Sequence, residues 1–143
     1  MTSTSPDSPA RRPAPPLVSP AAWLAALWVG IMIHLDWHLG RPGHDHRSFD
    51  LAWHWLFAVP AFLPVAWLAR RRWPGAPFRA AVMIAVLGVL LGQGVEPLAE
   101  VILFEDGYEP FTDPLRWRIF AEFVGVGLAT LLLTTLGPSR RDA

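Results

Sequence analysis

The sequence predicts an all-α fold, an integral membrane antiparallel four-helix bundle, and three observations support this prediction. Apolar residues make up 52% of the 143 residues, and the mean hydropathy is +0.32. These residues are gathered into four blocks, each near the roughly 20 residues that a helix needs to cross a bilayer. The blocks are too long for strands, and a lipid-facing backbone must satisfy its hydrogen bonds within one segment, which favours helices.

The four blocks follow one another along the chain at residues 21–40, 51–69, 80–104 and 119–137, the last with a helical lead-in from Pro114. We therefore expect a four-span transmembrane domain over 21–137, between a disordered tail at 1–20 and a short tail at 138–143. The first 20 residues are rich in Ser, Pro and Ala, as disordered segments are. Because no small-x-small cleavage site follows the first block, we expect it to remain as a span.

Prolines and glycines interrupt two of the expected helices. Pro60 and Pro64 should bend the second helix. In the third, "GQGVEP" places Gly92, Gly94 and Pro97 around Glu96, and a proline removes a helical hydrogen bond, so that turn should loosen. An irregular turn at membrane depth must be covered by protein or line a cavity, which predicts a polar pocket there. Small residues should let helices approach closely, namely Gly88 with Gly92 and Gly125 with Gly127.

All twelve basic residues are arginines, and their distribution predicts the orientation. Eight lie in the two tails and the second connection, which share one side of a four-span protein, and four lie on the other side. Positive charge marks the cytoplasmic side, so we expect a plasma (inner) membrane protein with both termini cytoplasmic. Twelve acids balance the arginines, and we expect no nucleic-acid partner. The expected partners are the lipid bilayer and either a second copy or a larger membrane complex.

Ionisable residues cluster towards the outer ends of the expected spans. All five histidines lie between His34 and His54. At 1.5 Å per residue, His34 lies about 9 Å inside Gly40, and Glu122 lies about 12 Å from Pro114. Each helix contributes a pair of these residues at i and i+4, which lie on one face of the helix. Because a charge at the centre of a span costs about 2.5–3.5 kcal/mol on insertion scales, the four faces should turn inward and meet. The pairs are His34 with His38, Asp50 with His54, Glu96 with Glu100, and Arg118 with Glu122.

This layer predicts a metal site. The chain has no cysteine, so ligands must be N and O donors. We predict His34, His38, His54 and Glu100 as ligands, with Glu96 and Glu122 as further ligands or as a general base. Imidazole with carboxylate suits a transition metal ion, zinc or iron first. Two neighbours are given other roles: Asp36 lies about 200° around the helix from His34, which makes it a poor ligand, and Arg118 should neutralise Glu122 one turn away.

Several functions are compatible with these residues. A metal site that opens outward would serve a hydrolase or an oxidoreductase, and the sequence does not decide whether a reaction occurs. A haem-binding electron carrier would use His34 and His54 as axial ligands. A transporter or accessory subunit would pass protons or metal ions along Glu96, Glu100 and Glu122. A buried ion-pair network that only fixes helix packing is the structural alternative.

Overall fold

The computed structural model describes residues 14–40, 51–95, 102 and 114–137, and these residues form helices without any strand. The long helices are α1 (Pro20–Gly40), α2 (Leu51–Arg72), α3 (Pro77–Leu90) and α5 (Pro114–Leu136). A short 3-10 helix, η1 (Pro16–Val18), precedes α1, and a π-helical turn, η3 (Leu91–Val95), continues α3. The predicted all-α fold class is thereby confirmed.

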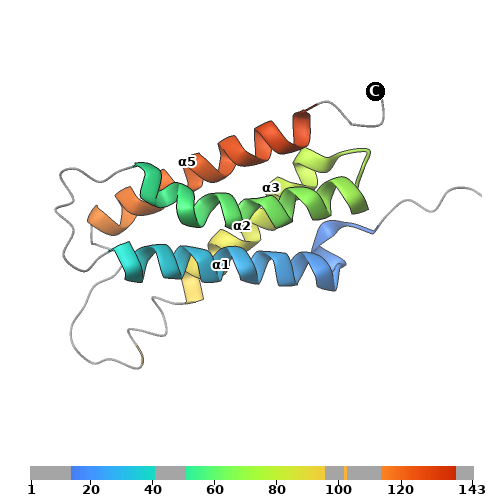
Figure 1. Cartoon of the computed structure of the whole chain (residues 1–143). Helices are drawn as coiled ribbons and strands as arrows, with labels where there is room; N and C mark the ends of the chain where they lie inside the picture. Colours follow the sequence, from blue (N-terminus) through green and yellow to red (C-terminus); the bar gives the residue numbers. More distant parts are fainter. Residues whose placement is uncertain (1–13, 41–50, 96–101, 103–113, 138–143) are drawn as a thin grey trace, which may run out of the picture.

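Consecutive long helices run antiparallel (Figure 1). Two hydrogen bonds fix one end of the bundle. Trp73 Nε1, after α2, donates to the carbonyl of Ala14 at 2.7 Å, and Arg70 Nη2 donates to the carbonyl of Gly137 at 3.1 Å. Both limits of the described chain therefore meet the α2–α3 connection at one end, which we call the arginine end after Arg70, Arg71, Arg72 and Arg79. The far end is the opposite one, with the end of α1 and the starts of α2 and α5.

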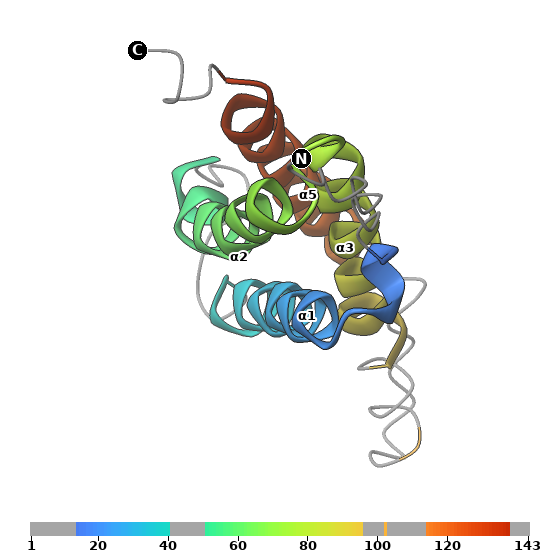
Figure 2. The same cartoon turned by 90° about the vertical axis from the view of Figure 1, so that its right-hand side faces the viewer.

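Helix α2 lies between α1 and α5 and packs most extensively of the four, against α5, α1 and α3, so it is the central helix in this sense (Figure 2). Helix α1 also packs along α3, and α5 packs mainly on α2. Each of the pairs α1–α3 and α2–α5 is parallel, since both partners run the same way between the two ends (Figure 1). Because α5 packs mainly on α2, much of the surface of α5 is exposed.

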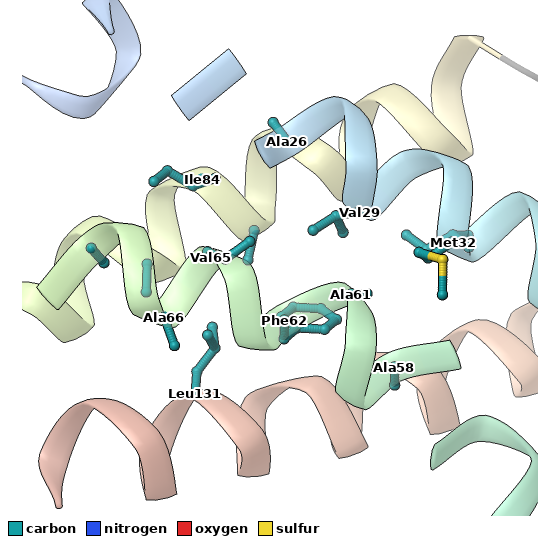
Figure 3. Close-up of a cluster of buried hydrophobic side chains, with 14 of the residues drawn as sticks. Ala26, Val29, Met32, Ala58, Ala61, Phe62, Val65, Ala66, Ile84 and Leu131 are labelled. Atoms are coloured by element: carbon teal, nitrogen blue, oxygen red, sulfur yellow. The ribbon is translucent and has the colours of Figure 1, made fainter. Parts of the chain in front are cut away.

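The core is built largely from small side chains, with a few larger ones between them (Figure 3). Phe62 and Phe123 are the largest of the fully buried side chains, and their ring centroids are 5.7 Å apart. Most of the described leucine and tryptophan side chains instead point outward, with Leu24 69%, Trp67 60% and Leu133 79% exposed, whereas Leu131 and Trp73 are buried. The buried alanines are Ala22, Ala26, Ala58, Ala61, Ala66, Ala69, Ala80, Ala81 and Ala85.

Two of the helices are long and apolar enough to cross a membrane. They cover Pro77–Gly94 and Trp117–Leu136, and α1 contains a shorter apolar stretch, Pro20–Asp36. Length and composition thus support membrane association of an all-helical protein.

Helices α1 and α3 touch backbone to backbone. A Cβ atom added to Gly88 would lie 2.6 Å from both the carbonyl oxygen of Ala26 and the Cβ of Val29. A Cβ on Gly92 would lie 3.0 Å from the Cα of Gly30. The prediction that Gly88 and Gly92 permit a close approach is confirmed.

The two glycines of the second predicted pair, Gly125 and Gly127, lie in different environments. The ring of Phe62 occupies the place of a Cβ on Gly127, so this glycine does allow α2 and α5 to pack closely. A Cβ on Gly125 would meet no heavy atom within 4 Å. The prediction for Gly125 is wrong, because two residues turn an α-helix by about 200° and the two glycines cannot face one neighbour.

The expected irregular turn in the third span is confirmed. The α-helical pattern of α3 ends at Leu90, and residues Leu91–Val95 form the wider π turn η3. The covalent cause lies in the sequence: Pro97 has no N–H for the carbonyl of Gln93, and its ring would clash with that carbonyl in a regular helix. The turn packs against α1 at Gly30, which covers its backbone with protein.

A tryptophan compensates for a proline in α2. In a regular helix the carbonyl of Pro60 would accept the N–H of residue 64, but residue 64 is itself a proline. Trp28 Nε1, on α1, donates a hydrogen bond to this carbonyl at 3.0 Å. The bond satisfies a backbone acceptor and ties α1 to α2.

The segment that we expected to be a disordered tail contains structure at its end. Pro16–Val18 form η1, Pro16 is buried, and Ser19 N donates to the carbonyl of Pro16 at 3.0 Å. The bond from Trp73 to Ala14 holds this segment against the start of α3. The low hydropathy of the segment did not reveal these contacts, because they depend on an indole 59 residues further along the chain.

We expect Gly88→Ala to destabilise the bundle by about 1–3 kcal/mol, the usual cost of overpacking, because its Cβ would overlap α1. The measurement is the free energy of unfolding in mixed detergent micelles. Gly125→Ala is the matched control: its Cβ enters open space, and alanine favours a helix by up to about 1 kcal/mol. Equal stability of the two variants would contradict the α1–α3 contact.

We expect Trp28→Phe to lower the unfolding free energy by about 0.5–1.5 kcal/mol through loss of its hydrogen bond. Pro64→Ala restores an N–H for the carbonyl of Pro60, so the cost of Trp28→Phe should shrink in that background. A double-mutant cycle measures this coupling. Strictly additive effects would show that the indole does not replace the missing donor.

Candidate functional site

Polar residues of three elements lie towards the far end. His34 and Asp36 belong to the last two turns of α1, Gln93 to the π turn η3, and Glu122 to the third turn of α5. Towards the other end of α5, the hydroxyls of Thr130 and Thr135 form hydrogen bonds within the helix, because each donates to the carbonyl four residues earlier. The described histidine and acidic side chains of the spans thus lie towards the end opposite the arginine end.

On α1 the structure reverses the expected orientation of the polar residues. Asp36 is 1% exposed and lies on the face that carries Val29 and Ile33. His34 is exposed and continues the outward stripe that carries Leu27 and Ile31. The expectation that His34 turns inward while Asp36 turns away is therefore wrong.

The cause of this reversal is the rotation of α1 about its axis. Gly30 must face Gly92, because only glycine backbones can approach so closely. Helix α1 also packs against α2, and the two contacts together bury the face of Val29. Asp36 lies about 20° around the helix from Val29, whereas His34 lies about 140° from it and is exposed. Sequence reasoning weighed the cost of burying each polar group and did not weigh which apolar face of α1 would pack against its neighbours.

Asp36 is the functional candidate that sequence reasoning undervalued. A buried carboxylate is costly unless it is paired, hydrogen-bonded or bound to a metal. Its spacing from Val29 and Ile33, seven and three residues, is the spacing of one helix face, and this signal could have been read from the sequence. Asp36 is the acidic residue buried most deeply in the described part of the chain.

The predicted ligand set is only partly covered by the structure. Trp28 on α1 contacts Pro60 on the antiparallel helix α2. From this contact towards the far end, His34 is six residues along α1 and position 54 is six residues along α2, about 9 Å in each case, so the two positions lie at the same level of the bundle. The side chains of His38 and His54 lie outside the described residues. Glu96 and Glu100 also lie outside them. Convergence of these four groups therefore stays a prediction.

Glu122 on α5 is partly buried and forms an ion pair on its own helix. Arg118 Nε donates to Glu122 Oε1 at 3.0 Å, which confirms the expected pairing one turn apart. The side chains are 57% and 27% exposed, so this is a partly solvated ion pair. Glu122 lines a groove between α2 and α5 together with Trp55 and Val59, away from the core face that contains Asp36.

Within the described residues, no group of three or more histidine and acidic side chains could hold a metal ion. The fold and the far end define an all-helical protein with two helices able to cross a membrane and a buried carboxylate near one end. Comparisons with protein-family models, curated proteins and solved structures find no match.

Proposed function

We propose that the chain is a four-span membrane bundle that binds a transition metal ion near its far end. The distribution of side-chain sizes supports the membrane part. Helices in lipid gain little from burying large apolar groups, so they pack through small residues and dispersion. The alanine core and the outward leucines and tryptophans fit that setting, whereas in water the same exposed apolar surface would drive aggregation.

Helix α2 fits this proposal although it is the least apolar long helix. Pro60 and Pro64 are exposed, but Trp28 on α1 donates a hydrogen bond to the carbonyl of Pro60, which cannot pair with residue 64. Interrupted helices are tolerated at membrane depth when protein covers the freed backbone groups. At the arginine end, the Arg71 guanidinium lies 5.2 Å from the centre of the Trp67 ring, a pairing suited to the headgroup level.

The single observation that carries the metal proposal is the burial of Asp36. A carboxylate that is 1% exposed in an alanine-rich core is held there by pairing, hydrogen bonds or a metal ion, and a metal ion is a group that a carboxylate and histidines can share. We propose Asp36 as a ligand together with His54 and Glu100. His34 is exposed on the other face of α1 and His38 follows it by four residues, so these two histidines fit a position outside that site. The periodicity of buried Phe57, Ala58 and Ala61 favours position 54 for the same side of α2.

The other proposed groups have unequal support. The exposed position of His34 favours an outer role, such as metal capture, and gives less support to haem ligation by His34 and His54. Glu96 follows η3 by one residue and is the better proposed general base, because Glu122 is engaged by Arg118. A metal ion with an open position would acidify a bound water, which is the chemistry that a hydrolase needs.

We expect both termini and the α2–α3 connection to lie on the cytoplasmic side, because the arginines gather there. Reporter enzymes fused after Ala143 and inserted at Gly43 should show opposite compartments. A cytoplasmic reporter that is active at both positions would contradict the four-span topology.

We expect Asp36→Asn and His54→Ala to remain folded while losing most of their bound zinc or iron, because each substitution removes one proposed ligand. Metal per folded protein, measured by elemental analysis after purification in mild detergent, checks this. Asp142→Asn, near the other end of the sequence, is the control.

A structural ion pair gives the opposite result for the same variant. Asp36→Asn would then strand a buried cation and cost about 3–5 kcal/mol of stability. Loss of folding with unchanged metal content would therefore refute the metal proposal.

A further inference from the structure

A long groove lies between α2 and α5, separate from the buried carboxylate. Its volume is about 540 Å³, within the range of small-molecule sites. Along α5 it extends from Glu122 to Thr134, twelve residues or about 18 Å. The lining residues are Trp55, Val59, Leu63, Glu122, Gly125, Val126, Ala129, Thr130, Leu133 and Thr134.

The chemistry along the groove suits hydrocarbon. The two lining threonines offer no free donor, because Thr130 Oγ1 donates to the carbonyl of Val126 at 2.9 Å and Thr134 Oγ1 to that of Thr130 at 2.5 Å. At Gly125 the space is open, since an added Cβ would meet no heavy atom within 4 Å. A ligand that lay here would gain contact area and no hydrogen bonds from the threonines.

One end of the groove is charged. Glu122 lines it and accepts a hydrogen bond from Arg118 Nε. The Arg118 side chain is 57% exposed, and a guanidinium has four N–H donors besides the one on Nε. Trp55 and Trp117 are exposed at this level, as expected of side chains at a membrane boundary. The groove therefore has an apolar length and a charged mouth, where Arg118 has hydrogen-bond donors besides the one that it gives to Glu122.

We propose that this groove holds one acyl chain of an anionic phospholipid, with the phosphate at Arg118 and the chain running past the middle of the span towards the arginine end. The inference rests on the proposed membrane location. Its length favours a lipid chain over a helix of a second copy: about 18 Å is close to the depth of one leaflet, half of the roughly 30 Å hydrocarbon core, whereas a helix would cross the whole core.

The test uses the full chain purified in mild detergent from membranes that contain phosphatidylglycerol and phosphatidylcholine. Native mass spectrometry counts the phospholipids retained by each protomer. We expect Gly125→Leu and Ala129→Leu, whose side chains fill the groove, to lower retention by about tenfold, because they exclude about two methylene groups or more. Ala121→Leu is the matched control: it is exposed on α5 and does not line the groove.

A second variant pair tests the head of the lipid. Arg118→Gln should reduce retention of phosphatidylglycerol by about fivefold, and Arg79→Gln, at the arginine end, should leave it unchanged. Phosphatidylglycerol that carries a diazirine in mid-chain should label Val59 and Val126 in the wild-type protein, which needs no variant to fold.

Three outcomes would overturn the proposal. They are equal retention in Gly125→Leu and Ala121→Leu, absence of labelling at the groove, and conversion of a dimer to a monomer by Gly125→Leu without loss of lipid, which would assign the groove to a second copy. Extraction of the wild-type protein from membranes by alkaline carbonate would instead refute the membrane location itself. The metal content of the same samples reports separately on the far end.

Discussion

The backbone contact between α1 and α3 determines much of this structure. Gly30, Gly88 and Gly92 meet so closely that no side chain fits between them, and this fixes how both helices are rotated. Close packing of backbones replaces the large apolar core of a soluble bundle as the source of cohesion. Because α1 packs against α2 as well, the buried face of α1 is that of Val29, which includes Asp36 and leaves His34 exposed.

Helix α2 links the two parallel pairs. It contacts α1 and α3 on one side and α5 on the other, and its two prolines do not end it. The hydrogen bond from Trp28 and the capping of α5 by Arg70, whose Nη1 donates to the carbonyl of Thr134 at 2.7 Å, bind it to its neighbours. Because α5 has few contacts beyond α2, the groove between them stays open to the surroundings.

The polar features of the far end fall into two places. Asp36 lies inside, among residues of the alanine-rich core, whereas Glu122 and Arg118 lie at the mouth of the apolar groove. One place suits a cation and the other suits an amphiphile. The sequence predicts that the i and i+4 pairs of all four helices turn inward and meet in one polar layer. The described residues instead occupy these two separate places.

The sequence by itself determined the helical class, the order and approximate limits of the long helices, the irregular turn before Pro97 and the Arg118–Glu122 pair. These follow from hydropathy, covalent chemistry and spacing within one helix, which are local properties. Only the tertiary structure decided which face of α1 is buried, that α2 is central, that Pro16 packs at the arginine end and that Gly125 opens into a groove. Each depends on a neighbour distant in sequence, and helix periodicity alone does not reveal which neighbour will be present.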